Sequence, residues 1–108
     1  MATEVPAAPL PVTKCVLVKY EYVADILERR TPFRADHIAH WKPLADDGQL
    51  LLGGATDPPT DAYLVLRGVP REEIESLISL DPYVKNDLVI THAIFDWNVV
   101  IGSSLQTV

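Results

Sequence analysis

The sequence predicts an α+β domain in which strands and helices follow one another in the order β-α-β-β-α-β. Segments rich in β-branched and aromatic residues alternate with segments whose apolar residues recur at helical spacing, and Gly and Pro residues separate them. This order is the split βαβ arrangement of ferredoxin-like folds. We therefore expect a four-stranded antiparallel sheet with helices on one face.

The first strand and the first main helix come from the N-terminal half. Residues 14–22 have largely apolar side chains in both alternating sets, which is typical of a strand covered on both faces. The helix is expected near residues 32–47, with Thr31 as N-cap and Pro32 in the first turn. Pro43 removes one backbone hydrogen bond, so we expect a kink or an early break there.

A hairpin is expected in the middle of the chain. Residues 50–52 are three leucines and predict a short buried strand that stops at Gly53-Gly54, a bulge or turn. Residues 62–66 predict its partner strand, after the turn at Pro58-Pro59.

The C-terminal third begins with a second helix at residues 70–80, whose acidic first turn suits the positive end of the helix dipole. Asp81 and Pro82 then have the form of an N-cap and a first-turn proline, which predicts a short helix through Asn86. The last strand is expected at residues 90–101.

One face of this last strand is apolar, with Phe95 and Trp97 among its residues, whereas His92 and Asp96 interrupt the other face. Because 108 residues provide no third layer, the uncovered face of the sheet needs a partner. We expect a homodimer that packs through the sheet faces.

Composition restricts the function classes further. We expect one domain at residues 13–108, after a disordered proline-rich tail at residues 1–12. A formal net charge of −6 disfavours nucleic acid and anionic membranes as partners. The chain has no apolar stretch of roughly 20 residues and no signal-peptide pattern, and its single cysteine, Cys15, cannot form an internal disulfide. These features favour the cytoplasm.

Four short motifs occur in an order that is shared with a known family. They are Arg34-x-x-His37, Gly48-Gln49-Leu50-Leu51 with Gly53-Gly54, Asp81-Pro82-Tyr83, and a last strand that contains Trp97. In this pattern the chain resembles the YciI-like (YCII-related) family, over residues 14–101.

The resemblance implies a dimeric α+β barrel, the fold that this family shares with muconolactone isomerase. It also implies that His37 and Asp81 share a small pocket. One characterised member type eliminates chloride from a chlorinated hydroxyhydroquinone, so the resemblance offers proton abstraction coupled to loss of a leaving group as a mechanistic template.

The chemistry of histidine suits acid/base catalysis at this pair. Imidazole gives and takes protons near neutrality when its second ring nitrogen is held, and the resemblance makes Asp81 the expected partner that holds His37. Two alternatives stay open: a partly buried His37 that bonds only a backbone carbonyl, and an Asp81 that serves only as a helix cap.

Three further residues are candidates for substrate binding. Arg34 offers a planar guanidinium to a carboxylate or phenolate, unless it is simply a solvated surface residue. Tyr83 offers a hydroxyl, unless its ring only packs against the sheet. Trp41 shares the helix side of Arg34 and His37. His37, His40 and His92 do not form a metal-ligand motif, so neither a metal nor a cofactor is expected.

Two functions from different classes remain. The first is a small cofactor-independent lyase or isomerase that acts on a small cyclic oxygenated substrate, phenolic or lactone, with His37 as the base. The alternative is a non-catalytic dimeric module that binds a small molecule or another protein, because ferredoxin-like folds host many unrelated functions. A structural role in a larger assembly is compatible with the second.

Overall fold

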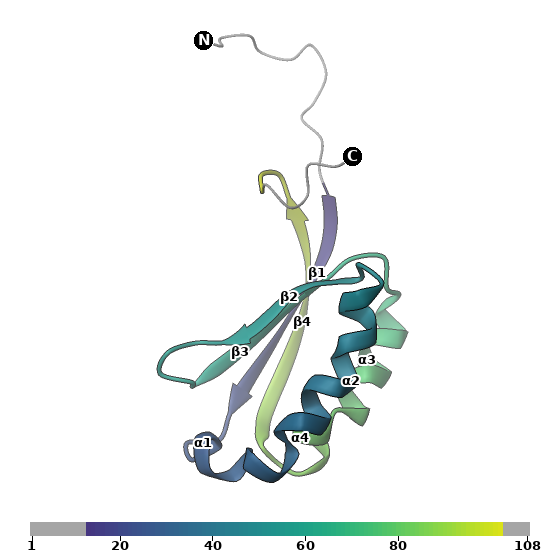
Figure 1. The fold of residues 1–108 in the computed structure, drawn as a ribbon. Helices are drawn as coiled ribbons and strands as arrows, with labels where there is room; N and C mark the ends of the chain where they lie inside the picture. Colours follow the sequence, from purple (N-terminus) through teal and green to yellow (C-terminus); the bar gives the residue numbers. More distant parts are fainter. Residues whose placement is uncertain (1–12, 103–108) are drawn as a thin grey trace, which may run out of the picture.

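The computed structural model describes residues 13–102, which form a four-stranded antiparallel sheet with helices on one face (Figure 1). The strands are β1 (Thr13–Tyr22), β2 (Leu50–Ala55), β3 (Asp61–Leu66) and β4 (Val89–Val99), in the spatial order β2-β3-β1-β4. The predicted α+β, ferredoxin-like fold class is confirmed. The predicted tail at residues 1–12 lies outside the described residues.

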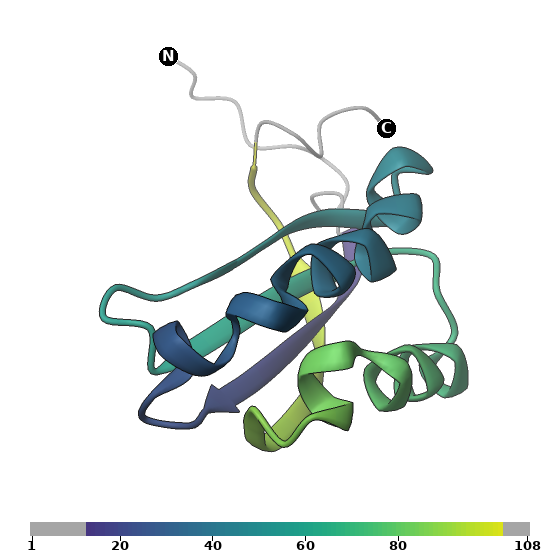
Figure 2. The ribbon, with the colours of Figure 1, turned by 60° about the horizontal axis from the view of Figure 1, so that its bottom comes forward.

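Three helices lie on the covered face. They are α2 (Arg34–Asp46), α3 (Arg71–Leu80) and α4 (Pro82–Lys85), preceded by the short α1 (Ile26–Arg29). Helix α2 packs over the β2–β3 side of the sheet, whereas α3 and α4 lie beside it over the rest (Figure 2). No helix among the described residues is long and apolar enough to cross a membrane.

The core lies between the sheet and these helices. Alternate residues of β1, namely Val18, Tyr20 and Tyr22, point to this side and are buried, as the two-residue period of a strand dictates. Ile74 and Ile78 of α3 are fully buried against them, one helical turn apart. Helix α3, the second helix of the predicted βαββαβ order, is therefore a regular amphipathic helix that packs on the sheet.

The first main helix differs from the prediction at its start and at Pro43, and it ends at Asp46, one residue before the predicted end. Thr31 is not its N-cap, because residues 31–33 form a separate 3-10 turn and α2 begins at Arg34 without a side-chain cap. The early break at Pro43 is also wrong, since α2 continues to Asp46. Pro43 lies in the last turn, where its carbonyl still accepts the Asp47 N–H at 3.1 Å and closes the helix end.

Strand β2 also corrects a prediction. The strand runs through Gly53 and Gly54 to Ala55, so the glycines form no turn, and the register shift against β3 lies between Leu50 and Leu52. The strand is not buried, because it is an edge of the sheet and Leu52 is 61% exposed. A run of leucines predicts a buried strand as long as the position of the strand in the sheet is unknown.

The other face of the sheet has a large apolar region, and none of the described residues covers it. Leu17 of β1 lies between Val65 of β3 and Phe95 of β4 in the register. Phe95, Trp97 and Leu52 are large side chains that remain between 44% and 61% exposed, and Leu52 pairs with Val65 on this same face. We call this row of residues the open sheet face.

Candidate active site

Asp81 lies at the junction between α3 and α4, and its local structure follows from the sequence. Its carboxylate accepts the backbone N–H of Tyr83 at 2.9 Å, so it is the N-cap of α4 with Pro82 in the first turn, as predicted. A capping carboxylate is usually solvated, but Asp81 is 0% exposed. A buried charge of this kind needs further partners.

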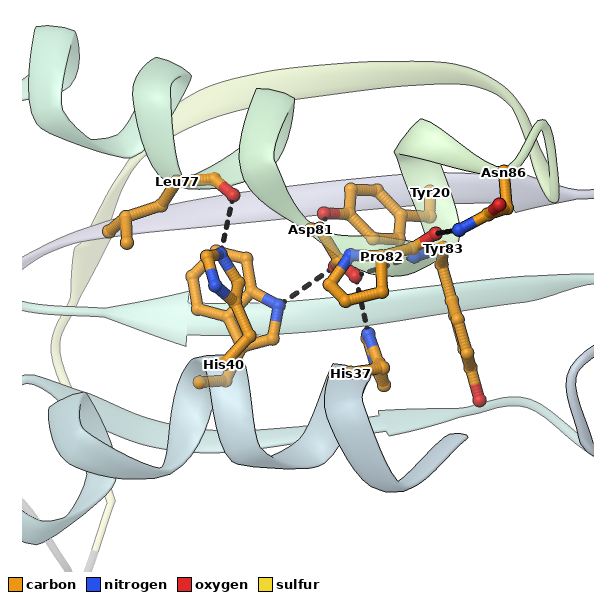
Figure 3. A network of polar contacts seen from close by, with 9 residues as sticks. Tyr20, His37, His40, Leu77, Asp81, Pro82, Tyr83 and Asn86 are labelled. Carbon is orange, nitrogen blue, oxygen red and sulfur yellow. Dashed lines mark hydrogen bonds and ion pairs between the residues drawn. The ribbon is translucent and has the colours of Figure 1, made fainter. Parts of the chain in front are cut away.

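Three side chains from other elements supply them (Figure 3). The Nδ1 atom of His37 lies 2.8 Å from Oδ1, and Oδ2 accepts the Trp41 indole N–H at 2.8 Å and the Tyr20 hydroxyl at 2.9 Å. With the Tyr83 N–H, each carboxylate oxygen therefore has two donors. A carboxylate with its acceptor sites filled in this way is stable in the interior only as the anion.

The electrostatics agree with this geometry. Burial by itself raises the pKa of Asp81, but the hydrogen bonds from His37, Trp41 and the Tyr83 backbone outweigh it and hold the pKa below its ordinary value. Asp81 is therefore ionised at neutral pH. It accepts a hydrogen bond from Nδ1 of His37, which leaves Nε2 as the ring nitrogen with no hydrogen bond to any residue from 13 to 102.

The His37 ring is fixed by a second contact. It stacks on the Tyr83 ring with 3.8 Å between ring centroids and an interplanar angle of 3°. One ring nitrogen is thus held by a carboxylate and one ring face by an aromatic plane, while the side chain keeps 17% of its surface exposed. The imidazole is both oriented and accessible, as an acid/base group requires.

The accessible side of His37 borders a cavity of about 450 Å³ between α2 and the β2–β3 hairpin. This volume lies within the range of small-molecule sites. The walls include Tyr83 and Trp41 beside His37, and Arg30 and Arg34 near the start of α2. The cavity is therefore large enough for a small molecule next to the imidazole.

All of the predicted site residues lie at or beside this cavity. His37 and Asp81 are in contact, Arg34 is an exposed residue on its lining, and the buried Tyr83 forms a wall. Trp41 also lines it, but its N–H is taken by Asp81, so this group is not free for a ligand.

The other two histidines take no part in the site. A ring nitrogen of His40 lies 2.7 Å from the Leu77 carbonyl, and His92 is exposed on β4. Within residues 13–102, His, Cys, Asp and Glu side chains do not gather in groups of three or more that suit a metal ion. The predictions on metals and cofactors stay predictions.

Sequence reasoning missed three residues of the site, namely Tyr20, Tyr22 and Arg30. A signal for Tyr20 was present, because a tyrosine in the middle of a buried strand face needs a partner for its hydroxyl. The partner lies 61 residues away, so local patterns do not reveal it. Tyr22 and Arg30 line the cavity only because β1 and the turn after α1 come together beneath α2.

Gly53 of β2 provides a testable feature of the cavity wall. It pairs with Leu64 in the register, and both residues line the cavity. A Cβ atom at Gly53 would lie 2.6 Å from Cδ2 of Leu64, so Leu64 would have to move. We expect Gly53→Ala to lower the free energy of unfolding by about 1 kcal/mol and to weaken ligand binding, as measured by urea denaturation and calorimetry.

Gly54→Ala is the matched control, because an added Cβ there meets no atom within 4 Å. This variant should retain the stability and the ligand affinity of the original chain. Both glycines line the cavity, so equal effects of the two substitutions would contradict a role for the close contact between Gly53 and Leu64.

The fold and the site together define a class: a ferredoxin-like sheet covered by helices on one face, with an accessible histidine held by a buried aspartate beside a cavity under the longest helix. The family comparison agrees, since the model of the YCII-related domain matches residues 13–98. The chain belongs to this family. The resemblance noted from the sequence is confirmed.

A search of solved structures adds one relative of known activity. The chain is similar to 5-chloro-2-hydroxyhydroquinone dehydrochlorinase (TftG) from Burkholderia phenoliruptrix AC1100, solved in complex with 2,5-dihydroxybenzoquinone. The TM-score is 0.67 at 23% sequence identity, over 77% of this chain and 92% of the other. This likeness establishes the shared fold. No curated protein matches the sequence.

Proposed function

We propose that the protein is a small enzyme of the lyase or isomerase type that performs cofactor-independent acid/base chemistry on a small cyclic oxygenated substrate, phenolic or lactone. The observation that carries this proposal is the way His37 is oriented by Asp81 at the edge of the cavity. Its Nδ1 atom lies 2.8 Å from the buried Asp81 carboxylate, and the remainder of the ring borders a cavity of about 450 Å³. A histidine held in this way is poised to accept a proton at Nε2.

In the proposed reaction, Nε2 of His37 removes a proton from a hydroxyl or an acidic carbon of the substrate. The electron pair left behind either expels a leaving group, which is elimination, or is reprotonated at another atom, which is isomerisation. Asp81 stabilises the imidazolium that forms, because its negative charge is next to Nδ1. His37 then returns the proton to the product or to water.

The comparisons support this reaction class without identifying the substrate. The similar structure bears the name of a dehydrochlorinase and contains a dihydroxybenzoquinone. Loss of hydrogen chloride from a hydroxylated ring combines proton removal with departure of a leaving group, and both are within the chemistry of a single imidazole. Transfer of this activity to the present chain belongs to the proposal.

The test is to incubate the wild-type protein with a panel of chlorinated and unchlorinated hydroxyhydroquinones and unsaturated lactones, without added metal or cofactor. Absorbance, chloride release and uptake of solvent deuterium report elimination and proton exchange separately. Turnover or enzyme-dependent deuterium uptake is the expected result. Binding of these compounds without either reaction would contradict the enzyme proposal and favour the non-catalytic binding module.

We also propose that the protein is a homodimer formed through the open sheet face. Phe95, Trp97 and Leu52 expose large apolar surfaces on this face, and such patches on a small domain mark interaction sites. A second copy presents the same row, so the two faces are self-complementary about a two-fold axis. This surface is also the observation that favours an interaction module as the second candidate function.

Trp97→Glu tests this interface. A buried charge without a partner opposes association, so we expect the variant to shift from dimer to monomer in light scattering coupled to size exclusion. Leu80→Glu is the matched control, because Leu80 is 56% exposed on α3 and away from the open sheet face. A monomeric wild type, or a dimer that survives Trp97→Glu, would contradict the proposal.

A further inference from the structure

The cavity is lined by cationic side chains and by no carboxylate of the described residues. Its lining includes Arg30, Arg34 and Lys42, but none of the aspartates and glutamates of residues 13–102. This is unexpected in a chain with a formal net charge of −6, where acidic residues outnumber basic ones. Apart from the buried Asp81 carboxylate behind His37, the charges at the cavity are therefore positive, whereas the net charge of the whole molecule is negative.

The three cations differ in their partners. Lys42 forms an ion pair with Asp46 at 2.9 Å, so its charge is already compensated. Arg30 and Arg34 have no carboxylate within 4.0 Å among the described residues, and neither has Arg67, which is absent from the cavity lining, whereas Arg29 pairs with Asp25 and Arg71 with Glu75. Two uncompensated guanidinium groups thus lie on the cavity lining at the same end of α2.

Their position does not stabilise the helix. Arg34 is the first residue of α2, where the helix dipole favours negative charge and a positive charge is unfavourable. Arg30 precedes the same helix and is only partly exposed. Neither capping nor an ion pair accounts for the two arginines, whereas an anionic ligand in the cavity would pair with both.

Two tyrosine hydroxyls add neutral donors at this end. Tyr22 and Tyr83 line the cavity with an edge-to-face ring contact at 6.0 Å, and neither hydroxyl bonds any residue from 13 to 102. Burial raises the pKa of both side chains, although the charges of Arg30 and Arg34 oppose it. Both hydroxyls therefore stay protonated at neutral pH and can donate to an oxygen.

We propose that Arg30 and Arg34, assisted by the Tyr22 hydroxyl, form an oxyanion subsite, so that the substrate binds as a planar anion such as a phenolate, an enolate or a carboxylate. This inference rests on the proposed function, whose substrate it restricts. A guanidinium group is planar, so it binds the two oxygens of a carboxylate in a bidentate manner or donates two N–H groups to the single oxygen of a phenolate or enolate.

The subsite also orients the substrate relative to the base. Arg34 and His37 are three residues apart on α2, close to one helical turn of about 5 Å. An oxyanion at Arg34 and a reacting atom at His37 therefore belong to the same small ring. The proton that His37 removes comes from a ring position that is separated from the anionic oxygen, not from that oxygen itself.

Calorimetric titration with two probes tests the subsite on the intact chain. The first probe is 2,5-dihydroxybenzoquinone, which ionises in neutral water, and the second is its neutral dimethyl ether. We expect wild type to prefer the anion, and Arg30→Gln and Arg34→Gln each to weaken its binding roughly 10-fold or more, because a hydrogen bond to a charged group is lost. Binding of the ether should change little.

Arg29→Gln is the matched control, since Arg29 adjoins Arg30 in sequence but pairs with Asp25 and is absent from the cavity lining. It should leave both affinities unchanged. Equal binding of the two probes by wild type, no anion binding at millimolar concentration, or full affinity in both arginine variants would overturn the subsite.

These outcomes separate the subsite from the enzyme proposal. If the arginine variants lose anion binding but wild type turns over no member of the substrate panel, the subsite proposal is supported and the enzyme proposal is rejected. If wild type turns over a substrate and the arginine variants do so with an unchanged KM, the subsite proposal is wrong and the enzyme proposal stands.

Discussion

Replacing His37 with alanine is expected to lower kcat of the proposed reaction about 10²- to 10⁴-fold, the usual contribution of a positioned acid/base group. The variant loses the only imidazole that borders the cavity among the described residues. Its KM should change little, because the arginine and tyrosine side chains of the cavity remain. Steady-state kinetics with any substrate found in the panel measures both quantities.

Two further variants test whether the loss of kcat is specific to the basic nitrogen of His37. His40→Ala removes another partly buried histidine of α2, whose ring contacts the Leu77 carbonyl instead of Asp81, and it should retain kcat. His37→Gln keeps an N–H donor for Asp81 without a basic nitrogen, and it should be as inactive as His37→Ala but more stable. A folded His37→Gln variant with wild-type kcat would contradict the role of His37 as the base.

Replacing Asp81 with alanine is expected to have the largest effect on stability, a loss of about 3–5 kcal/mol in the free energy of unfolding. The substitution leaves the Tyr20 hydroxyl, the Trp41 N–H, the Tyr83 N–H and His37 without their shared acceptor in the interior. Each unpaired buried donor costs desolvation energy. Urea denaturation followed by far-ultraviolet circular dichroism measures the loss.

Asp81→Asn preserves the shape of the side chain but should still destabilise the protein, because no orientation of the amide gives every donor an acceptor. An NH₂ group at the Oδ2 position faces the Trp41 N–H, and at the Oδ1 position it faces the Tyr83 backbone N–H. Neither of these donors can become an acceptor. Wild-type stability in this variant would show that the carboxylate charge is unnecessary to the fold.

The stability of wild type and that of Asp81→Asn should depend differently on pH. Because the pKa of Asp81 is lowered in the folded state, the unfolded state binds more protons in the acid range. The stabilisation is complete above the ordinary value of 3.8 and is lost as the pH falls through the folded pKa. The difference in unfolding free energy between wild type and Asp81→Asn should therefore shrink with acidification. A constant difference would contradict an ionised Asp81.

Local rules were sufficient for much of the fold. The cap at Asp81 and Pro82 and the end of α3 at Leu80 follow from neighbouring residues, and both were predicted. The contact between His37 and Asp81 joins residues 44 positions apart, and only the family resemblance indicated it. The alternation of Phe95 and Trp97 on one face of β4 also agrees with the register.

The errors concern features that depend on tertiary position. Helix α1 has four residues, too few for a periodic pattern, and it was not predicted. The exposure of β2 depends on its place at the sheet edge, which leucine content does not encode. In the site, Arg30 and Tyr22 meet only after the chain turns back between β1 and α2, so spacing in sequence carried no signal for the cationic cavity.

The placement of the two tryptophans makes the molecule a source of two separate optical signals. Trp41 is 3% exposed and its indole N–H lies against the Asp81 carboxylate, whereas Trp97 is 44% exposed on the open sheet face. The fluorescence of Trp41 therefore reports changes at the cavity that it lines and local unfolding around the carboxylate. That of Trp97 reports a change in the solvent contact of the opposite surface. With Trp97→Phe and Trp41→Phe proteins, each event is followed by its own emission spectrum, without an extrinsic dye.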